Sequence, residues 1–457
     1  MKDIIWITKA LQKQGFSCYL VGGCVRDYIR KEEPHDYDFC TNAKPDEIIR
    51  VLKENHIPYH AEGIDYGTVV ANINGTDYEI TTYRKEQSYS DGRHPDSVIF
   101  ADDIKEDLSR RDFTVNAIAY DIKTKQFVDP FSGISDIRQG VLRCVGEADA
   151  RIQEDGLRIL RALRFAIKYD MKMDDSLKSA IHHNISMLDK VSKERITEEL
   201  RKILTCNRPV TSVFQEFSDV IVHIMPELVK TVGFGQNNKY HKHDVYEHIL
   251  AVVDNCQTNT FEIKLAALLH DIGKPDTCTL GEDGCNHFYG HAKESVKISR
   301  QVFQNDLVLT RTERERVLEL IEAHDNHVAS TEKSVKRFLA KHGLDFMYNW
   351  MILRQADMDD HIYPDKKNPN FYTDIPKITE ILSVLKDKEN CFSVKDLAIN
   401  GNDLMKEFDI PPSPLIGQIL NQLLDAVLDE EVANEKQDLL CMAEDVMNEK
   451  ENEDYER

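Results

Sequence analysis

The pattern of apolar residues changes once along this chain, close to Gly146. Before that point, short runs rich in β-branched and aromatic residues predict strands at 18–21, 36–40, 68–73, 78–83, 97–101 and 127–130. After it, longer amphipathic stretches such as 154–169 and 193–204 predict helices for most of the remaining length. The sequence therefore predicts an α+β fold, in which a mixed sheet with a few helices precedes an all-helical remainder.

Length and composition are those of a multidomain protein with apolar cores. The 457 residues correspond to three or four domains at roughly 100 to 200 residues each, and 41% of them are hydrophobic. No apolar run approaches the ~20 residues that a membrane-spanning helix needs, and Asp3 and Lys9 interrupt what would be the apolar block of a signal peptide. Ten cysteines without a C-x-x-C pair fit a reducing compartment. We therefore expect a cytoplasmic protein without a membrane partner.

The net charge of −22 argues at first against nucleic-acid binding, because affinity for phosphate chains comes largely from Lys and Arg. The charge is unevenly distributed, however. Residues 429–457 hold 12 acidic against 3 basic side chains, whereas residues 151–208 hold 13 basic against 9 acidic ones. The basic segment is compatible with a track for RNA, although a solvated helix surface would have a similar composition.

Two glycines and two aspartates near the N-terminus form the first candidate site. Gly22 and Gly23 follow a predicted strand, and Asp36 and Asp38 are separated by one residue on the next, so both carboxylates are expected on one face. Closely spaced carboxylates suit Mg²⁺, which accepts substrate phosphates in its remaining positions. The glycine turn lets backbone N–H groups approach a triphosphate, and Arg26 is placed to meet its charge. The combination predicts a nucleotide-polymerising site, whereas either half alone would be only a glycine turn or an acidic loop.

Three later segments extend this site. Glu79 lies on a predicted strand where it is a candidate third carboxylate, although a single strand glutamate is more often simply exposed. Residues 89–95 form a polar loop with glycine and proline, which is typical of a mobile element over a site. Arg110 and Arg111 precede an apolar helix start, and arginine forks bind phosphate oxygens in a bidentate manner.

A row of charged residues occupies the predicted helix 154–169. Asp155, Arg158, Arg161 and Arg164 recur at every third position and form a polar stripe beside an apolar one made of leucines. A functional interpretation is that a carboxylate acceptor next to an arginine donor pairs with the hydrogen-bonding edge of a nucleobase. The alternative is an exposed helix surface with an i,i+3 ion pair.

A second constellation lies between residues 237 and 363. It consists of His248, His270, Asp271, His291, His324 and Asp357, which follow one another along the chain in the order His, His-Asp, His, His, Asp. This order resembles the HD-domain metal phosphohydrolases. Imidazole and carboxylate ligands on several helices can hold one or two divalent transition metals that acidify a water for attack on phosphate. The alternative is a degenerate HD fold that serves only as a structural body.

The ordered motifs from residue 20 to about 137, together with segments 154–166, 193–200 and 396–434, resemble the class II tRNA nucleotidyltransferases, the CCA-adding enzymes of the polymerase β superfamily. The resemblance implies a polymerase β-like nucleotidyltransferase head at 1–140, an all-α neck at 141–210, an HD-type helical body at 211–375 and a tRNA-binding helical tail at 376–457. It also implies Mg²⁺ ligands and nucleotide contacts in the head, at Asp36 and Asp38 and at Gly23, Arg26 and Arg111 respectively. Base selection is implied at Asp155 and Arg158, with help from Arg161 and Arg164.

The activity that the resemblance implies is template-independent addition of C, C and A to the tRNA 3′ end from CTP and ATP, with metals on the carboxylates. An A-adding or CC-adding enzyme or a bacterial poly(A) polymerase remains an alternative, and loop 89–95 disfavours the CC-adding variant. An RNA-binding regulator with inactive sites is a further alternative, which the presence of both Asp36 and Asp38 disfavours. For the HD region we expect hydrolysis of 2′,3′-cyclic or terminal phosphates at RNA ends.

Overall fold

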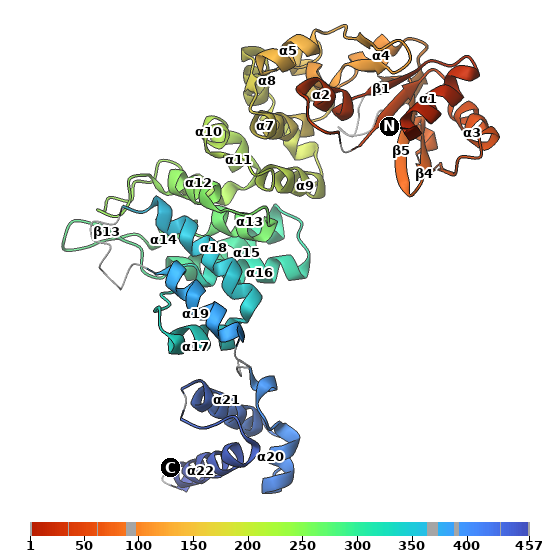
Figure 1. Ribbon diagram of the computed structural model, residues 1–457. Coiled ribbons are helices and arrows are strands. Elements are labelled where there is room, and N and C mark those ends of the chain that lie inside the picture. Colours follow the sequence, from red (N-terminus) through yellow and green to blue (C-terminus); the bar gives the residue numbers. More distant parts are fainter. Residues whose placement is uncertain are drawn as a thin grey trace. The chain divides into compact units, whose positions relative to one another are not determined.

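In the computed structural model, the chain forms two compact units (Figure 1). Unit 1 comprises Met1–Val229 with Gln301–Leu309, and unit 2 comprises Lys230–Arg300 with Thr310–Arg457. The structure describes residues 2–34, 36–61, 63–87, 97–362, 373–387, 393–429 and 431–455. The predicted loop 89–95 lies outside the described residues.

Unit 1 begins with a seven-stranded mixed sheet of order β3-β4-β5-β2-β1-β8-β9. The strands are β1 (Cys18–Val21), β2 (Asp38–Thr41), β3 (Tyr59–His60), β4 (Thr68–Ile73), β5 (Thr76–Thr82), β8 (Ala119–Asp121) and β9 (Gln126–Val128). Neighbouring strands are antiparallel except β2 and β5, which are parallel. A separate strand pair joins β6 (Arg84–Gln87) to β7 (Ser97–Phe100). The accompanying helices are α1 (Lys2–Lys13), α2 (Gly23–Arg30), α3 (Pro45–Glu54), α4 (Ile104–Ser109) and α5 (Gly133–Gln139).

The register of the sheet brings the acidic residues of the head together. Val21 pairs with Asp38, so the end of β1 lies beside the first residue of β2. Phe39 pairs with Ile80 on β5, and both side chains are buried. Because side chains alternate along a strand, Asp38 and Glu79 lie on the opposite face as neighbours across the parallel pair.

One detail of the predicted strand 36–40 is wrong. β2 begins at Asp38, so Asp36 lies in the preceding loop rather than on the strand. The reason is that β1 ends opposite Asp38, and the chain then turns at Gly22 into α2, which leaves no strand partner for earlier residues.

The remainder of unit 1 is mainly helical. It contains α6 (Ala148–Glu154), α7 (Leu157–Tyr169), α8 (Asp175–His183), α9 (Lys193–Leu204), α10 (Thr211–Glu216) and α11 (Ser218–Ile224), with β10 (Val141–Leu142) paired to β11 (Lys172–Met173). α7 packs against α9 and buries Leu160 and Leu163 completely.

The predicted helix 154–169 is in fact two helices with a break at Asp155 and Gly156. Asp155 has an extended backbone, and a Cβ at Gly156 would lie 2.3 Å from the Met187 carbonyl oxygen. The chain therefore needs a glycine for close backbone packing at this point, and Asp155 precedes the first turn of α7 instead of lying within it.

Unit 2 contains an α-helical bundle around α13. Its elements are α12 (Val245–Asn255), α13 (Phe261–Leu269), α14 (Lys274–Thr277), α15 (His291–Asn305), α16 (Arg311–Ala323), α17 (Glu332–His342), α18 (Leu344–Asp360) and α19 (Ile375–Asp387), with the strand pair β12 (Thr279–Leu280) and β13 (Asn286–His287). α13 is buried along most of its length and contacts α12, α16 and α18. The residues at its C-terminal end are therefore held inside the bundle.

The last three helices of unit 2 have a core of their own. α20 (Gly401–Phe408), α21 (Pro414–Leu428) and α22 (Lys436–Tyr455) bury Leu404, Ile419, Leu423 and Leu439. Residues 409–413 separate α20 from α21. Within the described residues, none of the helices has the length and apolar character required to cross a membrane. The predicted α+β fold is confirmed.

Candidate functional site

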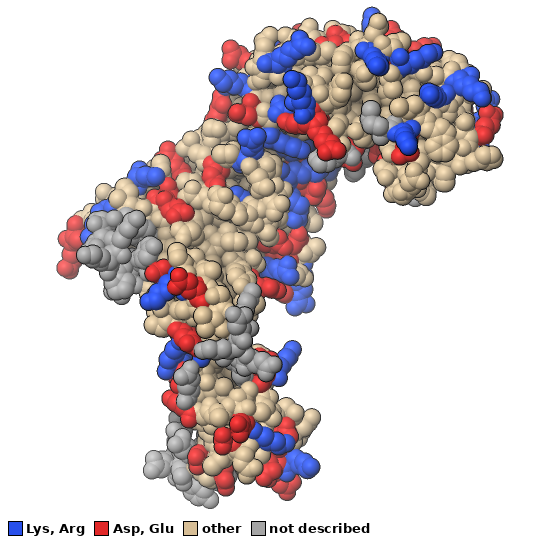
Figure 2. All heavy atoms as spheres, viewed as in Figure 1, with Lys and Arg blue, Asp and Glu red and all other residues tan. Residues whose placement is uncertain are grey.

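A cavity of about 650 Å³ in unit 1 collects most of the predicted head residues. It is lined by Gly22, Gly23, Arg26, Asp36, Asp38, Arg110, Arg111, Asp155, Arg158, Arg161 and Arg164, among others. Glu79 is exposed on β5 and is not among the lining residues. Figure 2 shows Lys and Arg side chains gathered over α7 and α9, with acidic side chains between them.

The glycine turn at the start of α2 is a structural requirement of this cavity. Gly22 has φ of 72°, a conformation that side-chain-bearing residues rarely adopt. A Cβ at Gly22 would lie 3.2 Å from Arg111 Nη1 and 3.7 Å from Asp38 Oδ2. The turn therefore leaves room for a ligand between a cation and a carboxylate.

The carboxylates of Asp36, Asp38 and Glu79 lie close enough to repel one another electrostatically. Burial, followed by the charges of Glu79 and Asp36, raises the pKa of Asp38 to about 6, against the lowering effect of Arg111. Such crowding of like charges is relieved when a divalent cation binds. The donor set of Asp36 and Asp38, with Glu79 close by, thus fits Mg²⁺.

Arg111 is held in place by an anchored carboxylate. Its Nη2 lies 3.2 Å from Asp107 Oδ2, and Asp107 also pairs with Arg110 at 2.8 Å. Burial opposes the charge of Arg111, but Asp107 outweighs burial and raises the pKa of the guanidinium. The cation beside Gly22 is therefore permanent.

Arg26 lines the cavity, so its contact with a phosphate stays a prediction, and its guanidinium is held in place by neighbouring side chains. Its side chain is buried, and its guanidinium donates to Asn116 Oδ1 at 2.7 Å, Tyr169 Oη at 2.5 Å and Asp27 Oδ1 at 2.9 Å. It also lies 4.2 Å from the centre of the Tyr169 ring. Arg26 therefore ties α2 to α7 and fixes the wall of the cavity.

The charged row on and before α7 makes ion pairs with residues outside the row. Asp155 pairs with Arg195 at 2.9 Å, Arg158 with Glu154 at 2.6 Å, and Arg164 with Glu199 at 2.6 Å. Arg161 pairs with the buried Asp112. Since all four predicted residues also line the cavity, the row is not an ordinary solvated helix surface.

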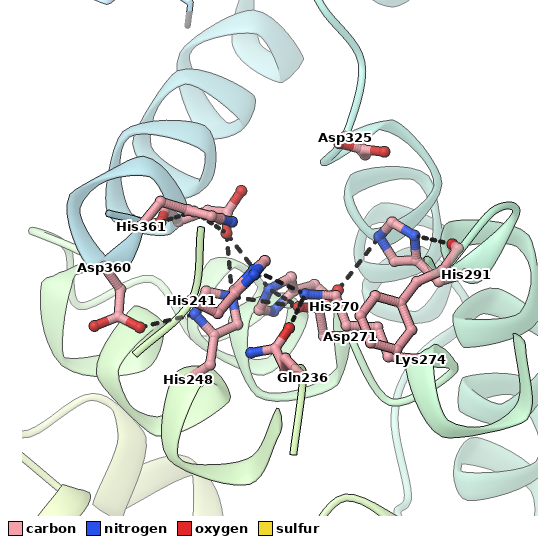
Figure 3. Close-up of polar contacts among 12 residues, drawn as sticks. Gln236, His241, His248, His270, Asp271, Lys274, His291, Asp325, Asp360 and His361 are labelled. Carbon is pink, nitrogen blue, oxygen red and sulfur yellow. Dashed lines mark hydrogen bonds and ion pairs between the residues drawn. The ribbon is translucent and has the colours of Figure 1, made fainter. Parts of the chain in front are cut away.

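The histidine and aspartate residues of unit 2 converge from five helices or helix ends (Figure 3). α12 supplies His248, the end of α13 supplies His270 and Asp271, α15 and α16 supply His291 and His324, and α18 supplies Asp357. Within the described residues, these side chains form two groups with metal-ligand spacing that share Asp271: His248, His270 and Asp271, and Asp271, His291 and His324. Five of these six residues are nearly inaccessible to solvent, and the side chain of His291 is 12% exposed.

The imidazoles are oriented as metal ligands are. The Nδ1 atoms of His270, His291 and His324 lie 2.7 to 2.9 Å from backbone carbonyl oxygens, which leaves their Nε2 atoms facing the cluster. Among the described residues, the buried Nε2 atoms of His248 and His270 make no hydrogen bond of normal geometry, although Asp271 Oδ2 lies 3.3 Å and 3.2 Å from them. Orphaned buried nitrogens beside an aspartate fit a bound cation.

The two aspartates remain charged. His270 and Lys274 outweigh the effect of burial and hold the pKa of Asp271 well below its usual range, and Lys274 Nζ lies 2.6 Å from Asp271 Oδ2. Asp357 lies 3.2 Å from His248 Nε2 and 3.0 Å from Arg354, and its pKa is also lowered, mainly by His361 against burial. Both carboxylates are therefore ionised and can act as anionic ligands, while Lys274 and Arg354 offset part of their charge.

Comparison with known proteins gives matches along most of the chain. Family models match at residues 18–143 (Poly A polymerase head domain), 170–228 (Probable RNA and SrmB-binding site of polymerase A), 242–348 (HD domain) and 367–443 (tRNA nucleotidyltransferase domain 2, putative). The CCA-adding enzyme of Ligilactobacillus salivarius is 30% identical over 452 residues, which cover 98% of this chain and 97% of that relative. The chain belongs to the CCA-adding enzyme family. It is therefore a nucleotidyltransferase.

Other relatives agree with this membership. The CCA-adding enzyme of Limosilactobacillus reuteri is 30% identical over 447 residues, covering 97% of this chain and 96% of the relative. Among solved structures, the Bacillus stearothermophilus CCA-adding enzyme in complex with CTP matches with a TM-score of 0.72 at 24% identity, covering 99% of this chain and 98% of that one. The Thermotoga maritima CCA-adding enzyme complexed with tRNA matches with a TM-score of 0.56 at 19% identity, covering 97% and 95%. Because both identities are below 25%, these two structures support a shared fold and nothing more.

Several residues at the head cavity and at the histidine and aspartate cluster of unit 2 were not predicted from the sequence. Phe165, Lys168 and Tyr169 line the head cavity and continue the helical spacing of the charged row by three or four residues, which was the available signal. In unit 2, His361 lies one turn after Asp357 and could have been found in the same way. His241 forms a third group with His248 and His361, but it lies in a loop and no periodicity points to it.

Proposed function

We propose that this chain adds C, C and A to the 3′ end of tRNA from CTP and ATP, without a nucleic-acid template. The observation that carries the proposal is the full-length similarity to CCA-adding enzymes, together with a cavity that combines carboxylates, arginines and a glycine turn. In the reaction, the 3′ oxygen of the RNA forms a bond to the α-phosphorus, the bond from that phosphorus to the leaving pyrophosphate breaks, and the hydroxyl proton leaves. Poly(A), A-adding or CC-adding activity is not favoured, because the named full-length relatives are CCA-adding enzymes.

The roles in the head follow from the chemistry of each side chain. Asp36 and Asp38 would hold Mg²⁺, which lowers the barrier by neutralising charge on the reacting phosphates. Arg111, Arg26 and the backbone of Gly23 would contact the triphosphate, and Arg26 also fixes the wall of the site through Tyr169. The exposed Glu79 is proposed as an auxiliary carboxylate, because its charge acts on Asp38.

The neck, body and tail helices are proposed to hold the acceptor end of tRNA, in line with the domain division at 140, 210 and 375. The basic composition of residues 151–208 supports this assignment.

We also assign the protein to the cytoplasm. The described cysteines are all unpaired, which is the state expected of cysteines in a reducing compartment.

The direct test of nucleotide addition is incubation of the full chain with three tRNAs, ending before the first C, after one C and after two. Each is supplied with CTP, ATP, or both, and the products are sequenced. Growth by C, C and A in that order supports the proposal. Addition of A alone or of long A tracts would identify one of the narrower relatives instead.

Replacement of Gly22 by alanine is expected to raise KM for CTP and ATP by about 10-fold or more. The added Cβ would meet Arg111 and Asp38 in a backbone conformation that costs roughly 1–3 kcal/mol for a residue with a side chain. Gly15→Ala is the matched control, because Gly15 also has positive φ but its Cβ would meet nothing within 4 Å. Equal KM values for the two variants would show that Gly22 has no role beyond the turn.

Asp155→Asn is expected to relax base choice, with discrimination of CTP and ATP from UTP and GTP falling roughly 10- to 100-fold in kcat/KM. The carboxylate accepts hydrogen bonds, and an amide presents a donor in place of one acceptor oxygen. Arg158→Lys should have a similar effect, because it removes the planar donor fork.

Arg195→Ala is the control for this change of base choice. It removes the 2.9 Å ion pair of Asp155 without altering a residue that lines the cavity. If Arg195→Ala relaxes base choice as much as Asp155→Asn, the ion pair matters and Asp155 does not read the base.

For unit 2 we propose a metal-dependent phosphohydrolase that acts on 2′,3′-cyclic or terminal phosphates of RNA. The orphaned Nε2 atoms of His248 and His270 support a metal at this site, and imidazole-rich ligands suit a divalent transition metal. When bound, such a metal acidifies a water. On a cyclic phosphate, the water oxygen would bond to phosphorus, one ring P–O bond would break, and the released ribose oxygen would take a proton. Breaking the bond from phosphorus to the 3′ oxygen would leave a 2′-phosphate and free the 3′ hydroxyl that nucleotide addition needs.

A further inference from the structure

An exposed aromatic pair lines a cavity of unit 2 that reaches the proposed metal ligands Asp271, His291 and His324. The cavity has a volume of about 450 Å³, and Tyr289 and His287 line it together with Asp271, His291 and His324. This volume falls within the ~300–1,000 Å³ typical of small-molecule sites. Tyr289 is 79% exposed, more than any other large hydrophobic side chain among the described residues. A large ring in this position suggests a ligand that covers it.

The two rings form a parallel stack. The centroids of His287 and Tyr289 are 5.4 Å apart, and their planes differ by only 3°. His287 Nε2 lies 3.2 Å from Asp283 Oδ1, and a Cβ at Gly281 would lie 2.4 Å from the same nitrogen. The imidazole is therefore confined by its neighbours and supports one face of Tyr289, while the high exposure of Tyr289 leaves the other face open.

The pair is connected directly to a proposed metal ligand. Gly290, with φ of 80°, turns the chain between Tyr289 and His291. The carbonyl oxygen of Phe288 lies 2.9 Å from His291 Nδ1, which anchors the same segment. The position of the Tyr289 ring is therefore coupled to the end of the cavity where a phosphate would react.

We infer that Tyr289, supported by His287, is a stacking platform for the base of a nucleotide whose phosphate lies at the cluster of Asp271, His291 and His324. A flat aromatic face recognises any nucleobase, because every base presents a π face, and it gives no base-edge readout. The substrate class is then nucleosidic phosphates at RNA 3′ ends, as opposed to base-free phosphate esters. The inference rests on the proposed phosphohydrolase activity and adds a specificity-determining residue to it.

The test compares adenosine 2′,3′-cyclic phosphate with methyl riboside 2′,3′-cyclic phosphate, which has the same reacting group and no base. With the metal-loaded full chain, the adenosine substrate is expected to have a kcat/KM roughly 10- to 100-fold higher. Tyr289→Ala should remove this preference by raising KM for the adenosine substrate. The rate on the methyl riboside and the metal content should stay unchanged. Tyr289→Phe should retain the preference, since the ring remains.

Leu280→Ala is the matched control, because Leu280 is 73% exposed on the neighbouring strand and does not line the cavity. A preference that survives in Tyr289→Ala would overturn the platform. If neither substrate is turned over with any metal, the phosphohydrolase proposal fails, and binding of adenosine 3′-monophosphate then decides the inference. A lower affinity for adenosine 3′-monophosphate in Tyr289→Ala, but not in Leu280→Ala, supports the platform. Identical affinities of the two variants overturn it.

Discussion

Asp38→Asn abolishes nucleotide addition, with an expected loss of roughly 10³-fold or more in kcat. Asp38 stands where β1, β2 and the Gly22 turn meet, and its carboxylate faces the same cavity as Arg111. Asparagine has nearly the same shape but lacks the charge that holds a divalent cation. Single-turnover incorporation of labelled CTP into tRNA lacking its 3′ end measures the effect.

The same substitution is expected to stabilise the metal-free protein. Burial and neighbouring carboxylates raise the pKa of Asp38 to about 6 in the folded state, above the ~3.9 of an unfolded chain. Ionised Asp38 therefore costs stability, by at most about 3 kcal/mol above pH ~6, and this cost disappears below pH ~4. In EDTA, Asp38→Asn should unfold at higher denaturant than the unsubstituted chain at pH 8 and at the same concentration at pH 4.

Three further carboxylates act as references for this result. Asp36→Ala should remove activity to a similar extent, and Glu79→Gln should lower it about 10-fold, because Glu79 influences Asp38 without lining the cavity. Asp77→Asn, on the exposed end of β5, should leave addition unchanged. Substantial CTP incorporation by Asp38→Asn would refute the metal assignment. Loss of both activity and stability would show that the substitution disturbs the fold.

The architecture was predictable where the local pattern and the tertiary environment agree. The strands 18–21 and 68–73 and the helix 193–204 occur with the predicted bounds, because each has one apolar face that packs against a neighbour. The predictions failed at Asp36 and at Asp155, which lie outside the regular elements to which they were assigned. In both places a contact with residues distant in sequence determines the backbone conformation. β1 ends opposite Asp38, and Gly156 packs closely against Met187.

The side chains that surround the sites were harder to predict than the motifs themselves. Spacing along one helix identified Arg161 as a member of a polar row, but its partner Asp112 comes from another segment and is buried. The same holds for Arg26, whose partners Asn116 and Tyr169 are distant in sequence. Pairings of this kind depend on tertiary packing, which a single sequence does not encode locally.

Asp271→Asn removes the phosphohydrolase activity and leaves nucleotide addition intact. Asp271 is the residue shared by two groups of potential ligands, with His291 Nε2 3.3 Å from Oδ1 and His248 Nε2 3.3 Å from Oδ2. Loss of its charge should therefore reduce the metal content of the full chain to nearly zero and hydrolysis of a cyclic-phosphate nucleotide by ~10³-fold or more. Asparagine is preferred to alanine because its amide oxygen can still accept a hydrogen bond from the buried Lys274 Nζ, whereas alanine would remove this acceptor altogether.

His324→Ala separates the two groups. It deletes a ligand only from the group of Asp271, His291 and His324, so about one metal ion per chain should remain where the parent chain holds about two. His327→Ala is the matched control, because His327 is an exposed histidine only three residues away. Elemental analysis of the chain loaded with Ni²⁺, Mn²⁺, Co²⁺ or Mg²⁺, with turnover measured before and after chelation, provides the readout. If the parent chain binds none of these metals and none supports hydrolysis, the HD region is a scaffold, and the orphaned nitrogens of His248 and His270 need another explanation.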